Sequence, residues 1–142
     1  NLSPANFGVE LTESVLLQHP DELIKLIKDW RKLGITISID DFGTGYSSLA
    51  YLAELDFNKL KIDQSFIRYY SSNVKTQAIL RSTILMSRAL GLETVAEGVE
   101  DKQMANILKV LGVNVIQGYL LSKPIPADEF KRWMESSSQK GA

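Results

Sequence analysis

The stretch that decides the fold reads Leu33-Gly34-Ile35-Thr36-Ile37-Ser38-Ile39-Asp40-Asp41. Before it, apolar residues recur at the spacing of one helix face, at Leu23, Leu26, Ile27 and Trp30. A glycine directly after a helix adopts the left-handed conformation that closes the last turn. The helix is therefore expected to end at this glycine, and a strand to follow over residues 35–40. In that strand the three isoleucines share one face, and the polar residues between them share the other.

The same succession of helix, Leu-Gly and apolar strand occurs twice more, at Leu90-Gly91-Leu92 and at Leu111-Gly112-Val113. The helices before these glycines carry apolar stripes that we expect to face the core, formed by Ile79, Met86 and Leu90 and by Met104, Leu108 and Leu111. Strands are predicted over residues 8–12, 35–40, 59–63, 92–97 and 113–117, and a last helix over about 127–135. Strands that alternate with helices predict right-handed β-α-β units and a parallel sheet, hence an α/β fold.

Composition limits the chemistry available to the protein. The chain of 142 residues fits one domain, and its 44% hydrophobic and 23% charged residues are ordinary for a globular protein. It has no cysteine and one histidine, which excludes disulfides, thiol chemistry and a zinc site of several histidines. The formal net charge is −1, so an anionic ligand has to be met by metal ions or by a few placed cations. No apolar run approaches the ~20 residues that cross a bilayer.

Polar side chains gather at the C-terminal ends of the predicted strands. They are Glu10, Asp40, Asp41, Asp63, Glu97 and Gln117, with Lys61 and Glu100 close by in the sequence. In a β/α barrel this edge of the sheet holds the active site. Carboxylates crowded there repel one another unless a divalent cation is present, and an all-oxygen ligand set favours Mg²⁺, Mn²⁺ or Ca²⁺. Because two such ions polarise a phosphate and activate water, the pattern indicates metal-assisted phosphoester hydrolysis.

Each of these residues also has a purely structural explanation. A pair of aspartates at a strand end is more often a helix cap or a turn, Lys61 and Asp63 can form a surface ion pair, and Gln117 can belong to a turn. The catalytic interpretation depends on convergence, because five successive strands each end in a residue able to bind a metal or a phosphate. Two short motifs carry no weight: Asp41-Phe42-Gly43 lacks the other kinase motifs, and Gly43-Thr44-Gly45 lacks the ending of a P-loop.

Five motifs in this order resemble those of EAL domains, a family of cyclic di-GMP phosphodiesterases. They are Glu10-Leu11-Thr12-Glu13-Ser14, Asp40-Asp41-Phe42-Gly43-Thr44-Gly45-Tyr46-Ser47-Ser48-Leu49, Lys61-Ile62-Asp63, Ala96-Glu97-Gly98-Val99-Glu100 and Gln117-Gly118-Tyr119. The likeness extends from about residue 8 to about residue 130. It implies a TIM-type β/α barrel that hydrolyses cyclic di-GMP (c-di-GMP) to linear pGpG.

The resemblance also implies a role for each matched residue. The acidic residues are similar to metal ligands: Glu10 and Asp40 for a first metal, Asp40 and Asp41 for a second, and Asp63 in support of the second. Lys61 resembles the lysine that contacts the nucleophilic water and the scissile phosphate, and Glu97 resembles the general base. Glu100 and Gln117 match positions that support the site or contact substrate. A loop that organises the second metal and the dimer interface is matched by Phe42, Gly43, Thr44, Gly45, Tyr46, Ser47 and Ser48, with Glu13 as its anchor.

The family's naming Glu-Ala-Leu motif is absent from the chain, and five strands are fewer than the roughly eight that close a barrel. We therefore expect residues 1–135 to be the C-terminal part of an EAL domain, an incomplete barrel, and residues 136–142 to be a disordered tail. The parent domain is expected to be the enzyme, and the fragment alone to be weak or inactive. The alternative is a catalytically inactive EAL-like receptor for c-di-GMP, or a protein-interaction domain.

Cofactors and partners follow from the same resemblance. It implies Mg²⁺ or Mn²⁺ in a two-metal site, with Ca²⁺ binding but not supporting turnover. The expected ligand is c-di-GMP and not a nucleic acid polymer. A homodimer through the Asp-Phe-Gly loop region and an upstream diguanylate cyclase-type or sensory domain are also expected. The implied location is the bacterial cytoplasm, or the cytoplasmic side of the inner membrane if the parent is tethered there.

Overall fold

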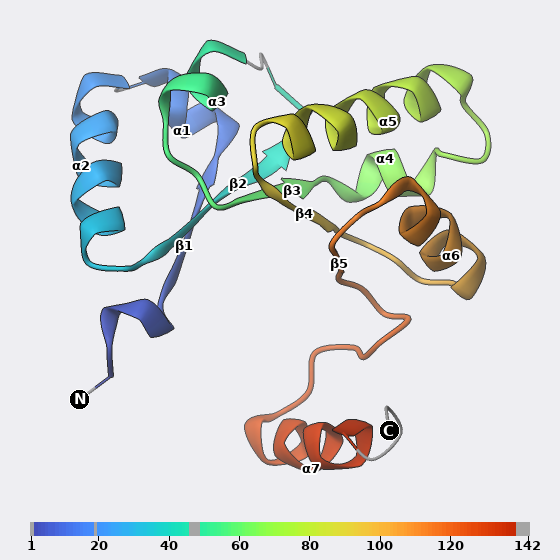
Figure 1. The fold of residues 1–142 in the computed structure, drawn as a ribbon. Helices are drawn as coiled ribbons and strands as arrows, with labels where there is room; N and C mark the ends of the chain where they lie inside the picture. The colour runs from blue at the N-terminus through green and yellow to red at the C-terminus, as the bar shows by residue number, and fades with distance from the viewer. Residues whose placement is uncertain (1, 19, 46–48, 139–142) are drawn as a thin grey trace.

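Five parallel strands form one sheet in the computed structural model, which describes residues 2–18, 20–45 and 49–138 (Figure 1). In their order across the sheet they are β1 (Gly8–Thr12), β2 (Thr36–Phe42), β3 (Lys59–Ile62), β4 (Glu93–Ala96) and β5 (Val115–Ile116). Each strand pairs in parallel with the one that follows it in the sequence. The predicted parallel α/β arrangement is confirmed, and all five C-terminal strand ends lie at one edge of the sheet.

Helices connect the strands. They are the 3₁₀ turn η1 (Pro4–Asn6) and the helices α1 (Glu13–Gln18), α2 (Pro20–Lys32), α3 (Leu49–Glu54), α4 (Gln64–Arg68), α5 (Val74–Ala89), α6 (Lys102–Leu111) and α7 (Ala127–Ser138). In Figure 1, α7 stands apart from the sheet at the end of a long irregular segment. It runs to Ser138, beyond the predicted end near residue 135, and residues 139–142 of the expected tail lie outside the described part of the chain. No described helix has the length and apolar character that spanning a membrane requires.

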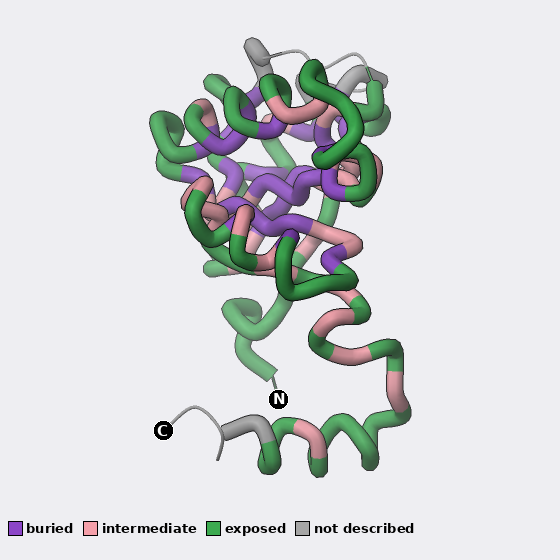
Figure 2. Tube along the Cα trace, turned by 90° about the vertical axis from the view of Figure 1, so that its right-hand side faces the viewer, coloured by how far each residue is buried: buried purple, intermediate pink, exposed green. Residues whose placement is uncertain are grey.

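The core lies between the sheet and the helices that pack on it (Figure 2). Ile37, Ile39, Leu60 and Ile62 of the central strands are at most 1% exposed, and Ile27 of α2 is fully buried. Two of the three isoleucines on the apolar face predicted for residues 35–40, Ile37 and Ile39, are thus buried in this core. Figure 2 also shows that α7 and the N-terminal segment are largely exposed, so the hydrophobic burial that stabilises the fold is concentrated in the middle of the molecule.

The predicted apolar stripe of α5 is wrong for two of its three residues, because only Met86 packs against the core. Ile79 and Leu90 are 49% and 41% exposed, whereas Leu80 and Ile84 are buried against the sheet. The buried side of α5 also contains a serine, Ser87, whose hydroxyl donates a hydrogen bond to a backbone carbonyl one turn earlier in the same helix. Because α5 is apolar on more than one side and hides two hydroxyl side chains, periodicity alone does not identify its core face.

Two asparagines hold the beginnings of neighbouring strands in register. The side-chain oxygen of Asn58, just before β3, accepts a hydrogen bond of 2.8 Å from the backbone N–H of Ile37 in β2. The side-chain oxygen of Asn114, just before β5, accepts hydrogen bonds of 2.8 Å from both the backbone N–H and the hydroxyl of Thr94 in β4. Each asparagine therefore supplies an acceptor where the strand ladder has none.

Candidate metal centre

A β-bulge near the end of β2 places two adjacent aspartates on the same side of the sheet. Between β2 and β3 the pairing shifts, because Ile39 faces Leu60 while Phe42 faces Ile62. Two residues of β2, Asp40 and Asp41, thus stand opposite one residue of β3. Asp41 has a φ of +54°, in the left-handed region that aspartate tolerates better than most residues. In a regular strand these two side chains would point to opposite faces.

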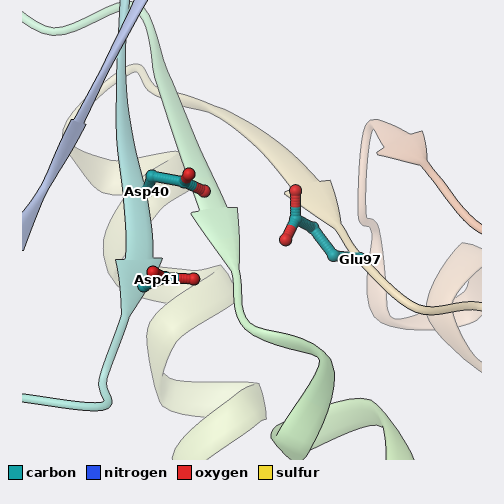
Figure 3. Close-up of side chains that lie close together, drawn as sticks. All are labelled: Asp40, Asp41 and Glu97. Atoms are coloured by element: carbon teal, nitrogen blue, oxygen red, sulfur yellow. The ribbon is translucent and has the colours of Figure 1, made fainter.

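Three carboxylates come together above β3 as a result of this bulge (Figure 3). Asp40 and Asp41 project from β2, and Glu97 projects toward them from the residue directly after β4. One carboxylate oxygen from each of the three lies within 4.8 Å of the others. All three residues are half-buried. This spacing and an all-oxygen donor set suit a hard divalent cation such as Mg²⁺, Mn²⁺ or Ca²⁺.

Lys61 of β3 is the cation that the carboxylates surround. Its ammonium nitrogen lies 2.7 Å from Glu10 Oε2, 2.9 Å from Asp40 Oδ1 and 2.8 Å from Glu97 Oε1. Burial by itself would lower the pKa of Lys61, but the contacts with Glu10, Glu97 and Asp40 outweigh it and raise that pKa above its ordinary value. Lys61 therefore carries its full positive charge in the folded protein, and one charge has to balance several carboxylates.

Two observations indicate that these residues are suited to hold a metal ion. Asp40 Oδ1 is buried and accepts no hydrogen bond of good geometry, although it lies within ion-pair distance of Lys61. A buried carboxylate oxygen without a directed donor is costly unless a cation is coordinated to it. In addition, the four carboxylates of Glu10, Asp40, Asp41 and Glu97 exceed the charge of Lys61 by three. A divalent ion would offset most of that excess.

Two further acidic residues predicted for the site, Glu10 and Asp63, lie outside the three-carboxylate group. Glu10 contacts Lys61, but its side chain is 52% exposed and it is not part of the three-carboxylate group. Asp63 follows β3 directly, and its Oδ1 accepts a hydrogen bond of 3.0 Å from the backbone N–H of Ser65, so that it caps the beginning of α4. One oxygen of Asp63 is thus engaged in helix capping. A direct ion pair of Lys61 with Asp63 is not among its three contacts in the described part of the chain.

Glu13 holds the loop that follows the aspartates. It is buried, and its Oε2 accepts hydrogen bonds of 3.3 Å from the backbone N–H groups of both Gly43 and Gly45. Gly43 has a φ of +94°, and a Cβ there would lie 2.7 Å from the ring of Phe66. The contacts agree with the anchoring role expected for Glu13. Tyr46, Ser47 and Ser48, the rest of the predicted loop, lie outside the described residues.

Glu100 and Gln117 are not part of the three-carboxylate group. Both line a cavity of about 380 Å³ that also includes Glu97, Tyr119 and Arg68. The sequence patterns did not single out Arg68 or its neighbour Gln64, since both belong to α4, a helix of five residues without a recognisable motif. The bulge was not predicted either, although the consecutive residues Asp40 and Asp41 interrupt the alternation of polar and apolar residues in β2.

Comparison with known proteins identifies the family. The EAL domain family matches residues 1–124. Cyclic di-GMP phosphodiesterase PdeR of Escherichia coli (strain K12) is 40% identical over 133 residues, which make up 94% of this chain and 20% of PdeR. The chain thus spans about a fifth of the length of this curated relative.

Solved structures agree with the sequence relatives. The PaMucR phosphodiesterase in complex with c-di-GMP matches with a TM-score of 0.87 and 40% identity, over 91% of this chain and 52% of that one. BlrP1 of Klebsiella pneumoniae, solved with c-di-GMP and either manganese or calcium, matches with a TM-score of 0.80 and 35% identity, over 87% of this chain and 31% of that one. These matches confirm the predicted fold class, part of a TIM-type β/α barrel. The chain belongs to the EAL domain family.

Proposed function

We propose that this chain is the C-terminal part of a metal-dependent phosphodiesterase that hydrolyses c-di-GMP to linear pGpG. The observation that carries the proposal is the convergence of Asp40, Asp41 and Glu97 within 4.8 Å at the C-terminal edge of the sheet, directly beside the ammonium of Lys61. Metal ligands, a general base and a phosphate-binding cation are the parts that phosphoester hydrolysis needs. The relatives named phosphodiesterases, and the solved complexes with c-di-GMP, support the choice of substrate.

The metal-binding residues in this proposal are Glu10, Asp40, Asp41 and Asp63. Asp40 would hold a metal ion, because it belongs to the three-carboxylate group and its buried Oδ1 accepts no hydrogen bond of good geometry. Asp63 would support the metal through its second carboxylate oxygen, because Oδ1 caps the beginning of α4. When bound, Mg²⁺ or Mn²⁺ polarises the phosphate and makes water a better nucleophile, whereas Ca²⁺ is expected to bind without supporting turnover.

The protein's own side chains orient the substrate and move the proton. Lys61 directs its ammonium toward the scissile phosphate, where its charge stabilises the additional negative charge of the transition state. Glu97 accepts a proton from the attacking water. The water oxygen forms a bond to phosphorus while the bond from phosphorus to the 3′ oxygen breaks, and that oxygen leaves as a hydroxyl after taking up a proton. The product is a linear dinucleotide with a 5′ phosphate.

The loop after Asp41 is proposed to connect the site with a second copy of the chain. Glu13 joins this loop to the end of β1 through its two hydrogen bonds to glycine N–H groups. The exposed side of α5 supports an apolar contact between copies, since Val74 and Leu85 are 78% and 64% exposed and lie eleven residues apart on one helix face. Further domains of the whole protein, such as a diguanylate cyclase-type or sensory domain, remain proposals.

The test is incubation of the chain with c-di-GMP and Mn²⁺, followed by chromatography for pGpG. We expect Glu97→Gln to reduce any turnover by about 10²-fold or more, because a general base contributes roughly that factor. Lys61→Met should lose activity as well, whereas Lys109→Met on the exposed side of α6 is a matched control that should not. Binding of c-di-GMP without any pGpG would exclude turnover by this chain alone, and the receptor alternative would then be tested by the same assay on the whole protein.

A further inference from the structure

The short helix α4 contacts both of the chain segments that carry the outer carboxylates of the metal group. It begins directly after Asp63, whose side chain caps its first turn. The ring of Phe66 meets the turn that follows Asp41, and Gln64 meets the loop that follows Glu97. Both contacts are made at a glycine, where the two chains approach more closely than a side chain would allow. The placement of α4 therefore affects how Asp41 and Glu97 face one another.

The contact with the turn after Asp41 is made by an aromatic ring edge. A Cβ on Gly43 would lie 2.7 Å from Cζ and 2.8 Å from Cε2 of Phe66, so the ring rests directly on the glycine backbone. The N–H of the same glycine donates a hydrogen bond of 3.3 Å to Oε2 of the buried Glu13. Gly43 is thus held between a carboxylate that accepts from its N–H and a ring that fills the space where its side chain would be.

The turn that Phe66 holds in this way begins at Asp41 itself. The carbonyl oxygen of Asp41 accepts a hydrogen bond of 3.3 Å from the N–H of Thr44 and one of 2.9 Å from the Thr44 hydroxyl. Asp41 has the left-handed φ of +54° and Gly43 a φ of +94°. Because the turn is only four residues long and closed by these hydrogen bonds, a displacement of Gly43 also changes the backbone of Asp41 and the direction of its carboxylate.

The contact with the loop after Glu97 is made by the backbone side of Gln64. A Cβ on Gly98 would lie 2.6 Å from Cβ and 3.4 Å from Cα of Gln64. The N–H of Glu97 donates a hydrogen bond of 3.1 Å to the carbonyl of Ile62, the last residue of β3. Glu97 is therefore fixed by the ladder and by the first turn of α4. Since this contact uses Cα and Cβ, it does not depend on the carboxamide of Gln64.

We propose that Phe66 is a positioning residue of the metal centre, which acts through Gly43 and fixes the direction of the Asp41 carboxylate. This inference rests on the proposed function, because it concerns the same metal. Phe66 is half-buried and packs against the hydrophobic core, so its ring is itself held in place. Removal of a side chain that orients a metal ligand without touching the metal typically lowers metal affinity 10–100-fold.

Calorimetric titration of the intact 142-residue chain with Mn²⁺ tests this role separately from turnover. Phe66→Leu keeps an apolar side chain but removes the ring edge from Gly43, and is expected to weaken Mn²⁺ binding about tenfold. Phe66→Tyr keeps the ring and adds an oxygen to Cζ, the ring atom nearest to the Cβ position of Gly43, and should weaken it as well. Gln64→Ala retains Cβ and should leave the Mn²⁺ affinity unchanged.

Phe57→Leu is the matched control for a merely structural effect. Phe57 is 5% exposed and lies two residues before β3, at the opposite end of that strand from the metal group. The same substitution there should lower the unfolding temperature at least as much as Phe66→Leu, because it also removes buried apolar volume. It should not change the Mn²⁺ affinity.

A double-mutant cycle identifies the residue through which Phe66 acts. In an Asp41→Asn chain, the further change Phe66→Leu should cause no additional loss of Mn²⁺ affinity. The positioning role would be overturned by an unchanged affinity in Phe66→Leu, by equal losses in Phe66→Leu and Phe57→Leu, by losses that multiply in the double variant, or by a wild-type chain that binds no Mn²⁺. The expected pattern of affinities without pGpG formation would exclude turnover by this chain alone and would still support the positioning role.

Discussion

Asp41 combines two properties that substitution can separate, a left-handed backbone and a carboxylate in the metal group. Asp41→Asn and Asp41→Gly both remove the charge and both tolerate a φ of +54°. Asp41→Val removes the charge and adds a β-branched side chain, for which this region costs about 1–2 kcal/mol. A loss of that size should lower the unfolding temperature by roughly 3–8 °C in a domain of this length.

Metal binding is expected to fall in all three variants alike. The loss of Mn²⁺ affinity should be at least about 10–100-fold, the effect that removal of even an outer-shell partner of a metal ligand produces. Calorimetric titration with Mn²⁺ measures the affinity, and thermal unfolding without metal measures the backbone cost. We expect only Asp41→Val to have a lower unfolding temperature, and all three variants to lose Mn²⁺ affinity. Wild-type stability of Asp41→Val would contradict the bulge, and wild-type Mn²⁺ affinity of Asp41→Asn would show that this carboxylate is no ligand.

Three further predictions follow from the fold and the site. Asn114→Ala leaves the N–H and the hydroxyl of Thr94 without their acceptor and should cost about 1–3 kcal/mol in urea unfolding, whereas Asn106→Ala on α6 should cost far less. Gly98→Ala should be more destabilising than Gly91→Ala, because both glycines have positive φ but only at Gly98 would a Cβ meet another side chain, at 2.6 Å; equal losses would contradict the packing of α4 on this loop. Mn²⁺ at a hundred times its Kd should stabilise the chain by about 2.7 kcal/mol, and Asp40→Asn should abolish the resulting rise in unfolding temperature.

Much of the fold could be predicted because the signals for it are local. The glycines after α2, α5 and α6 and the polar residues at the strand ends are visible in the sequence, and four of the five predicted strands overlap observed ones over most of their length. The core face of α5 could not be predicted. Which side of a helix is buried depends on the sheet it contacts, and Ile79 and Leu80 are equally apolar in the sequence although only Leu80 is fully buried.

The candidate site could also be predicted only in part. The residue types and their positions at strand ends predicted a carboxylate cluster around Lys61, and the structure brings Glu10, Asp40 and Glu97 to that ammonium. The approach of Asp41 to Asp40 and Glu97 depends on the bulge, which is a property of the pairing between β2 and β3. The sequence marks its position only by two consecutive aspartates that interrupt the alternation in β2. The capping of α4 by Asp63 also became visible only in the structure.

The detachment of α7 from the sheet divides the molecule into parts of unequal stability. A helix of 12 residues is marginal in isolation, so the amide hydrogens of α7 should exchange with solvent far faster than those of β3 and β4. The chain has two tryptophans, Trp30 packed against the core and Trp133 on α7, where it stacks with Phe130 at 5.9 Å. Each tryptophan reports on one part. Tryptophan fluorescence should therefore change in two steps as denaturant is added, with the environment of Trp133 lost first, and Trp133→Phe should leave a single cooperative transition.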